Sequence, residues 1–555
     1  MQTAAAGGEV LPILLHGVTG SGKTEIYLHA VEETIRVGRQ AIVLVPEIAL
    51  TPQTVQRFLS RFPGRVGLVH SGLSPGERYD TWLRAREGRL AVIVGPRSAL
   101  FTPLPNLGLI ILDECHDDSY YQDEEPFYHA QQVAMTYARL TQGVCLMGSA
   151  TPHVTDVYQA DLGKYLYLRL AERILAHQQV IRAQVERWKI TSRYQHLEEE
   201  AETIELPEVK IIDMREELKA GNRSIFSRIL QKELEKVLSH GQQAILFLNR
   251  RGTATYVFCR DCGYTLRCPR CDIPLTFHIQ RSANSGFIER NGALVCHYCG
   301  YQRKMPRACP ECGGTRIRQY GTGTERVEAE VQTLFEGVRT LRWDYETTRR
   351  KGAHEMILHH FANQHADVLI GTQMLAKGLD LPLVTLVGVI LADVGLNLPD
   401  YRAAERTFQV LTQVAGRAGR SPLGGEVILQ TFQPHNYVIQ TAAGHDYMGF
   451  YRQELEYRKR LGYPPFRQLA RLEYRHTNAE QGELITRKMA EQISTWLEEE
   501  GRRATEMVGP APCFFARIAG YYRWQIILRG VELHSLLRAR KWEGWRVEIN
   551  PPSLL

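Results

Sequence analysis

The sequence predicts an α/β protein with two doubly wound parallel-sheet regions, a cysteine-rich insertion in the second of them, and a small α+β C-terminal region. Short apolar runs of strand length alternate with helical segments in two separate stretches of the chain. Eight of the eleven cysteines fall in one segment between these runs. Because 555 residues exceed what one hydrophobic core can organise, we expect several domains.

The first α/β region spans residues 1–193. A strand over residues 11–16 leads into a helix over residues 25–36. Further buried strands, each ending in a polar residue or a turn, are expected at residues 41–46, 90–95, 107–113 and 144–149. In such a sheet, ligands bind at the C-terminal ends of the strands.

Three further parts follow this region. Residues 194–208 are polar and acidic, which predicts a linker or an exposed helix. Residues 209–434 form the second α/β region, interrupted by the insertion at 255–316, with strands expected at 244–248, 367–370, 386–391 and 426–430. Residues 435–555 form the C-terminal region, with a charged helix at 449–461 and strands at 468–474 and 524–528.

Charge is unevenly distributed. The net charge is +6, yet residues 250–326 carry thirteen Lys or Arg against five Asp or Glu. A local basic block suits a polyanion such as nucleic acid, although a solvated surface explains the charge equally well. The N-terminus has no secretory pattern and no apolar run is long enough to cross a bilayer, so we expect a cytoplasmic location and no membrane partner.

A complete phosphate-binding loop lies between the first predicted strand and the first predicted helix. Its residues are Gly17, Val18, Thr19, Gly20, Ser21, Gly22, Lys23 and Thr24. The glycines let backbone N–H groups turn toward phosphate oxygens at the start of a helix. We expect Lys23 to reach the β- and γ-phosphates of ATP and Thr24 to ligate Mg²⁺.

Two acids follow the predicted strand at 107–113. Asp113 is expected to hold Mg²⁺ directly or through water, and Glu114 to orient and deprotonate the attacking water. Cys115 is expected to be a small buried residue rather than a reactive thiol. The sequence Ser149-Ala150-Thr151, after another strand, fits a motif that couples ATP and nucleic-acid sites.

Two arginines, Arg417 and Arg420, lie three residues apart on one predicted helical face. Arginine is suited to stabilising charge on a transferring phosphoryl group, and it can be supplied by a second domain of the same chain. Without the phosphate loop, an ordinary surface pair would explain them better.

These elements occur in the order found in superfamily-two helicases with two RecA-like lobes. The sequence further resembles the PriA family of bacterial primosomal replication-restart helicases. The matching segments are residues 17–25, 45–53, 70–74, 97–103, 371–378, 400–405, 413–420, 461–466 and 509–512, together with the cysteine segment.

The resemblance implies ATP-driven 3′→5′ translocation and unwinding of DNA at stalled or repaired forks, followed by loading of the replicative helicase. The implied partners are forked and single-stranded DNA, helicase-loading primosome proteins and single-strand-binding protein, with the chain a monomer. Site residues carried over by the resemblance are Lys23, Thr24, Asp113 and Glu114 for hydrolysis, Arg417 and Arg420 as arginines from the other lobe, and Gly371, Thr372, Lys377 and Asp380 for DNA coupling.

Aromatic side chains are concentrated in residues 117–129, which match the family's loop after the acidic residues. Two roles fit them equally well, stacking on nucleic-acid bases and packing between the lobes. The aromatic residues are Tyr120, Tyr121, Phe127 and Tyr128.

Four C-x-x-C pairs define the cysteine segment: Cys259 and Cys262, Cys268 and Cys271, Cys296 and Cys299, Cys309 and Cys312. Two pairs close one structural Cys₄ site, so eight thiolates imply two Zn²⁺. Iron–sulfur clusters also use four cysteines, but four evenly built knuckles favour zinc. Spacing leaves the pairing open, whereas the resemblance implies a nested order with the outer two pairs on one ion and the inner two on the other. His278 and His297 are expected to be solvated rather than ligands.

The family carries a further DNA-binding region before the phosphate loop, and this sequence begins without it, so we expect an N-terminally short chain. Two other functions therefore stay open. One is a module that recruits primosome partners with weak or no unwinding, and the other is an RNA-directed helicase, because the ATPase motifs alone do not distinguish DNA from RNA.

Overall fold

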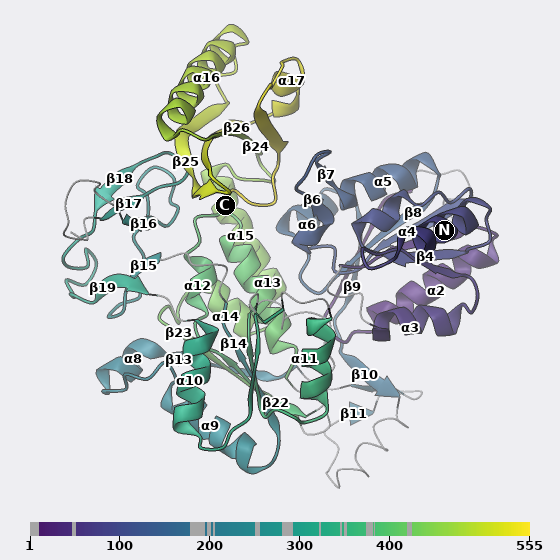
Figure 1. The fold of residues 1–555 in the computed structure, drawn as a ribbon, viewed down its shortest axis with the longest axis horizontal. Coiled ribbons are helices and arrows are strands. Elements are labelled where there is room, and N and C mark those ends of the chain that lie inside the picture. Colours follow the sequence, from purple (N-terminus) through teal and green to yellow (C-terminus); the bar gives the residue numbers. More distant parts are fainter. Residues whose placement is uncertain are drawn as a thin grey trace. The chain divides into compact units, whose positions relative to one another are not determined.

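The computed structural model describes residues 10–46, 52–177, 195–196, 201–203, 206–249, 256–279, 292–320, 323–344, 347–348, 352–372, 381, 383–418 and 424–555. The chain divides into two compact units (Figure 1). The first comprises Met1–Pro207, Ala376–Leu383 and Gly416–Gly425, and the second comprises Glu208–Leu375, Val384–Ala415 and Glu426–Leu555.

The first unit is built on a seven-stranded sheet, parallel throughout, with strand order β3-β4-β2-β5-β8-β1-β9. Its strands are β1 Ile13–Gly17, β2 Gln40–Leu44, β3 Val66–Leu68, β4 Val92–Gly95, β5 Leu107–Leu112, β8 Val144–Ser149 and β9 Leu166–Leu170. Its helices are α2 Lys23–Arg36, α3 Pro52–Arg61, α4 Pro75–Arg86, α5 Ala130–Leu140 and α6 Val154–Asp161. Side chains of α2 and α3 share a core cluster with Val43 and Ile111 of the sheet.

Within the acidic stretch after this sheet, residues 195–196 and 201–203 form strands rather than the linker or exposed helix expected there. Strands β11 (Gln195–His196) and β12 (Ala201–Thr203) join β10 (Ile174–His177) in an antiparallel sheet of order β10-β12-β11. The expectation relies on charge, and charged residues also occur in short strands.

The second unit contains a six-stranded sheet, again wholly parallel, with order β13-β23-β22-β14-β21-β20. The strands are β13 Glu208–Asp213, β14 Gln243–Phe247, β20 Thr340–Trp343, β21 Val368–Gly371, β22 Val384–Val389 and β23 Glu426–Thr431. The helices are α8 Met214–Lys219, α9 Arg228–Ser239, α10 Thr324–Leu334, α11 Ala353–Ala362, α12 Asp393–Leu396, α13 Ala403–Ala415, α14 Tyr437–Ala443 and α15 Tyr447–Leu461. The strands expected from sequence in both parallel sheets lie within two residues of those observed.

Two antiparallel sheets complete the second unit (Figure 1). The insertion forms a sheet of order β18-β17-β16-β15-β19, with β15 Tyr256–Cys259, β16 Thr276–Ile279, β17 Gly292–Val295, β18 Gln302–Lys304 and β19 Ile317–Tyr320. The C-terminal sheet has order β25-β26-β24-β27, with β24 Gln468–His476, β25 Glu506–Ile518, β26 Tyr521–Gly530 and β27 Trp545–Ile549, and helices α16 Ala479–Glu499 and α17 Leu533–Arg538. The predicted fold class, two parallel α/β lobes with a cysteine-rich insertion and an α+β C-terminal domain, is therefore confirmed.

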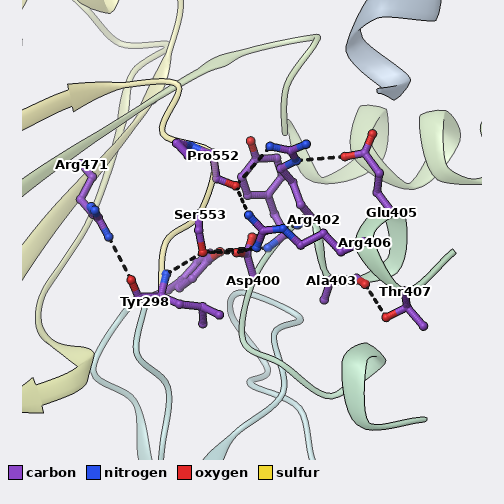
Figure 2. A network of polar contacts seen from close by, with 12 residues as sticks. Tyr298, Asp400, Arg402, Ala403, Glu405, Arg406, Thr407, Arg471, Pro552 and Ser553 are labelled. Atoms are coloured by element: carbon purple, nitrogen blue, oxygen red, sulfur yellow. Dashed lines mark hydrogen bonds and ion pairs between the residues drawn. The ribbon is translucent and has the colours of Figure 1, made fainter. Parts of the chain in front are cut away.

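A buried polar network links the parallel sheet region of this unit with its two antiparallel parts (Figure 2). Just before α13, Asp400 accepts hydrogen bonds from Arg406 (2.7 Å) and from the hydroxyl of Ser553 (2.6 Å). Arg406 also donates to the carbonyl of Pro552 at 2.6 Å. From the insertion, the hydroxyl of Tyr298 accepts a hydrogen bond from the backbone N–H of Tyr401 at 3.1 Å.

The same network extends into α15 through Arg458, which is fully buried. Its guanidinium donates to Glu405 of α13 at 3.0 Å and to Glu454 at 2.8 Å. Each of these buried charges has an oppositely charged partner, which is the condition under which a protein interior tolerates charge.

Candidate nucleotide site and cysteine clusters

The phosphate-binding loop connects β1 to α2. Gly20 and Gly22 have φ angles of 85° and 81°, a left-handed conformation that glycine adopts without strain. At Gly17, a Cβ atom would lie 2.4 Å from Ser21 Oγ. These three glycines therefore let the backbone curl tightly at the N-terminus of α2, as an anion-binding loop requires.

Two polar groups of this loop fit a phosphate ligand. The ammonium of Lys23 is buried and donates to the carbonyls of Gly17 (2.8 Å) and Val18 (3.4 Å). The Ser21 hydroxyl is buried and has no hydrogen-bond partner within the described part of the chain. A buried donor of this kind suits a phosphate oxygen, because leaving it unpaired is unfavourable.

The two predicted acids directly follow β5, at the same edge of the parallel sheet as the phosphate loop that follows β1. Asp113 donates its backbone N–H to Leu44 O at 2.9 Å, and it accepts a 3.0 Å hydrogen bond at Oδ1 from the hydroxyl of Tyr27. Glu114 has φ 47°, a left-handed conformation that is uncommon outside glycine and is often found at functional sites.

The environment of Asp113 disfavours its charged form. Burial, followed by the neighbouring charge of Glu114, raises the pKa of Asp113 to about 6, while Lys23 and the hydrogen bond from Tyr27 oppose the rise. A carboxylate held next to another carboxylate attracts a divalent cation, so this pair suits Mg²⁺.

A second chain of contacts joins these acids to the Ser-Ala-Thr sequence. His116 Nδ1 lies 2.7 Å from Ser149 Oγ and 3.5 Å from Glu114 Oε2. The Ser149 oxygen also accepts the backbone N–H of Thr151 at 2.9 Å. The motif expected to couple two sites therefore contacts the acidic motif directly.

Tyr27 and Gly148 also contribute to this site, although neither belongs to a motif recognised in the sequence. Tyr27 lies one turn after Lys23 on the buried face of α2, and Gly148 directly precedes Ser149. The available signals were the four-residue spacing from Lys23 and the glycine inside an apolar strand.

Tyr120, one of four aromatics expected either to stack on bases or to pack, is fully buried. Its hydroxyl donates to the carbonyl of Asp113 at 2.6 Å and lies 3.0 Å from that of Leu44. Tyr120 is therefore not accessible for stacking on nucleic-acid bases, and of its two predicted roles this one is wrong. Tyr128 is only half-buried and lies edge-on to Phe101, so stacking stays a prediction for the other three aromatics.

The remaining predicted helicase residues are only partly described. Arg417 is buried, and the carbonyl of its neighbour Gly416 accepts a hydrogen bond from Arg173 at 3.5 Å. Gly371 ends β21, and Thr372 donates its N–H to Trp343 O at 3.4 Å. Three predicted residues lie outside the described residues, namely Lys377, Asp380 and Arg420.

The eight cysteines form two four-sulfur clusters. One contains Cys259, Cys262, Cys309 and Cys312, and the other contains Cys268, Cys271, Cys296 and Cys299. This is the nested order that the resemblance implied. Sulfur atoms of different pairs lie 3.6–3.7 Å apart, close to the roughly 3.8 Å that a tetrahedron with Zn–S bonds of about 2.3 Å requires.

All four C-x-x-C pairs share one turn geometry. In each, the residue after the second cysteine has a left-handed φ, between 52° and 81°. Its backbone N–H donates to the carbonyl of the first cysteine at 2.8–3.0 Å. The residues at this position are Gly263, Asp272, Gly300 and Gly313. Two such turns direct their paired sulfurs at each cluster, a geometry that fits two structural metal sites.

His297 is buried rather than solvated, which corrects the sequence expectation. Its Nδ1 lies 3.2 Å from the carbonyl oxygen of Pro512, and its own carbonyl accepts a hydrogen bond from Gln525 at 2.8 Å. The insertion packs against the C-terminal sheet at this point, which sequence spacing does not reveal. The side-chain environment of His278 lies outside the described residues.

Among the described residues, no helix is both long and apolar enough to cross a membrane.

Four known families match the chain. The DEAD/DEAH box helicase family matches residues 2–160 and the helicase conserved C-terminal domain matches residues 314–422. The PriA DNA helicase Cys-rich region domain matches residues 268–284 and 289–304. The primosomal protein N C-terminal domain matches residues 459–552.

Among solved structures, the DUF1998 helicase MrfA bound to DNA aligns over 80% of this chain and 50% of its own, with 14% identity and a TM-score of 0.42.

Sequence relatives cover nearly the whole chain. Replication restart protein PriA of Bacillus subtilis (strain 168) is 45% identical over 529 residues, which are 95% of this chain and 60% of the relative. The PriA proteins of Treponema pallidum (strain Nichols) and Rickettsia felis are 39% and 34% identical, covering 93% and 98% of this chain and 71% and 76% of the relatives. The chain thus spans about 60% of the Bacillus relative's length. It belongs to the PriA family of replication restart proteins.

Proposed function

We propose that this chain is an ATP-dependent 3′→5′ DNA helicase or translocase that acts at stalled or repaired replication forks and initiates primosome assembly. The observation that carries the proposal is the meeting of the phosphate loop and the Asp113–Glu114 pair at the C-terminal edge of one parallel sheet. Family membership selects replication restart among the many uses of such a motor.

In this proposal, Lys23 binds the β- and γ-phosphates of ATP, and Thr24 and Asp113 hold Mg²⁺. Glu114 orients the attacking water and accepts its proton. Arg417 and Arg420 stabilise the charge that develops on the transferring phosphoryl group. Bound Mg²⁺ would supply charge neutralisation between the phosphates.

The two cysteine clusters are proposed to hold one Zn²⁺ each. A site closed by four thiolates leaves no open coordination position, so the ions would be structural rather than catalytic. The insertion they stabilise is basic, which supports binding of forked or single-stranded DNA. Primosome and helicase-loading proteins, with single-strand-binding protein, are the proposed protein partners.

Steady-state ATP hydrolysis with and without forked DNA tests the proposal. We expect strong DNA stimulation in the parent chain and a loss of about 100-fold or more in Lys23→Ala, since a preorganised charge on the phosphates disappears. Lys164→Ala is the matched control, because that lysine is exposed in the same unit. Folded, metal-loaded protein whose ATP hydrolysis is not stimulated by forked DNA would contradict the proposed helicase function.

A second candidate is supported by the cysteine-rich and C-terminal domains, which match families of their own outside the two helicase lobes. It is a partner-recruiting module with weak or no unwinding. Displacement of a labelled strand from a 3′-tailed fork separates the two, because a recruiting module would hydrolyse ATP slowly and leave the duplex intact. Displacement from a 5′-tailed substrate alone would overturn the proposed polarity.

A further inference from the structure

Tyr27 connects the phosphate-loop helix to the end of a different strand. It lies four residues after Lys23 on α2, so the two side chains share one helical face, and both are buried. The Tyr27 hydroxyl donates a hydrogen bond of 3.0 Å to Asp113 Oδ1, across 86 positions of sequence. The Tyr27 hydroxyl thereby connects the helix that follows the phosphate loop with the acidic residue that follows β5.

A glycine in the intervening strand makes this contact possible. Strand β8 lies between β5, which precedes Asp113, and β1, which precedes the phosphate loop. A Cβ atom at Gly148 of β8 would lie 1.7 Å from the Tyr27 hydroxyl oxygen. Since no side chain fits at that distance, the tyrosine reaches Asp113 only because position 148 is glycine.

We propose that Tyr27 is a positioning residue for nucleotide hydrolysis, holding the Asp113 carboxylate in the orientation in which it accepts the divalent cation. The inference rests on the proposed function, which assigns Asp113 to Mg²⁺. An aspartate χ2 torsion is broad and roughly two-fold, so the backbone alone does not fix where the two oxygens point. The hydrogen bond from Tyr27 to Oδ1 restricts that rotation, together with the backbone hydrogen bond that the carboxylate receives from Glu114.

Partners of this type matter in characterised metal sites. Removing the hydrogen bond that orients a ligand typically weakens metal affinity or activity by about 10–100-fold. Here the donor is neutral and the acceptor carries charge when ionised, which strengthens the bond relative to a neutral pair. Burial of Tyr27 also excludes water as a ready substitute donor.

Tyr27→Phe isolates this role, because the ring that packs in the core with Val31 and Ile111 is retained and only the donor is removed. We expect Mn²⁺ binding in the presence of a non-hydrolysable ATP analogue, measured by electron paramagnetic resonance, to weaken by about 10-fold or more. The Mg²⁺ concentration for half-maximal hydrolysis should rise by a similar factor. Tyr137→Phe, on a half-buried tyrosine of α5, should change neither value.

Two further variants separate positioning from general damage. Gly148→Ala should reproduce the loss of metal affinity by pushing the ring aside. In an Asp113→Ala background, Tyr27→Phe should produce no additional loss, since the group that it orients is absent. A folded Tyr27→Phe protein with metal affinity within two-fold of the parent, or an equal loss in both backgrounds, would overturn the inference.

The metal measurement also distinguishes this inference from the proposed function. A parent chain that binds Mn²⁺ and the ATP analogue but hydrolyses nothing would refute the helicase proposal alone. The effect of Tyr27→Phe on Mn²⁺ affinity would still decide whether Tyr27 positions Asp113.

Discussion

Two buried carboxylates show how neighbouring residues set opposite electrostatic behaviour in one chain. Burial and the charge of Glu114 raise the pKa of Asp113 to about 6. Burial would also raise the pKa of Glu473, but hydrogen bonds and charge from Arg523, with help from Arg475, lower it to about 2. The second carboxylate is stabilised by its arginine partners, whereas the first is the one proposed to bind Mg²⁺.

Glu473 gives a pH-dependent prediction. A carboxyl whose pKa is lowered on folding stabilises the fold fully above its unfolded value, near 4.5, and loses that stabilisation as pH falls toward 2. Glu473→Gln should therefore lower the free energy of unfolding of the C-terminal region by about 3 kcal/mol at pH 7, leaving Arg523 buried without its partner. Urea denaturation at several pH values measures the difference.

The difference between parent and Glu473→Gln should shrink by about 1 kcal/mol at pH 3.5, because the unfolded parent then binds a proton that the folded parent does not. Glu483→Gln provides the control, since its ion pair with Arg487 is solvent-exposed. A difference that stays constant between pH 7 and pH 3.5 would contradict the assigned role of the carboxylate.

The strands of the cysteine insertion are too short to stabilise its sheet by themselves. Its five strands have three or four residues each, and four cysteines are fully buried members of its core cluster. Strands of this length bury little apolar surface. Zn²⁺ bound by the two proposed Cys₄ sites would supply part of the missing stabilisation, as metal ions do in other small metal-dependent modules.

Metal content tests this account of the insertion. Elemental analysis of the purified chain should find two zinc ions, and Cys271→Ser and Cys312→Ser should each retain about one, because they belong to different clusters. Cys145→Ser, on a buried cysteine of β8, should retain both. Iron in the protein, together with the visible absorption of an iron–sulfur cluster, would contradict zinc as the metal. Loss of both ions from either variant would contradict two independent sites.

At the scale of the whole molecule, the buried network of Figure 2 explains why the second unit includes three different sheets. Its links run from Asp400 and Arg406 at the start of α13 to Ser553 near the C-terminus, and from the backbone before α13 to Tyr298 of the insertion. Arg458 of α15 adds Glu405 to the same set. We expect the parallel sheet, the insertion and the C-terminal sheet to respond to perturbation together.

Breaking this network should loosen the C-terminal sheet from the rest of its unit. Asp400→Ala leaves the buried guanidinium of Arg406 without its carboxylate, which we expect to lower stability by about 3–5 kcal/mol. Limited proteolysis should then release a C-terminal fragment faster than in the parent. Arg487→Ala, which breaks an exposed helical pair, should change stability by less than about 1 kcal/mol, and equal proteolysis of both variants would contradict the proposal.

Much of the fold was predictable because its determinants are local in sequence. The phosphate loop lies between an apolar run and a helical segment. The strands of both parallel sheets correspond to apolar runs that end at turns. The acidic stretch was misjudged because charge does not distinguish a short strand from a helix. The role of Tyr120 stays open in the sequence, and His297 is misjudged there, because the burial of both depends on segments far away in sequence.

Three motifs of this protein can be identified from the amino-acid sequence alone: the phosphate loop, the acidic pair after a strand and the four C-x-x-C pairs. These follow from residue types at fixed short spacings, which the backbone converts directly into local geometry. Only the tertiary structure decided that Tyr27 reaches Asp113 over Gly148 and that Asp400 meets Ser553. Such contacts depend on strand order and on how distant elements pack, and neither is encoded in any single stretch of chain.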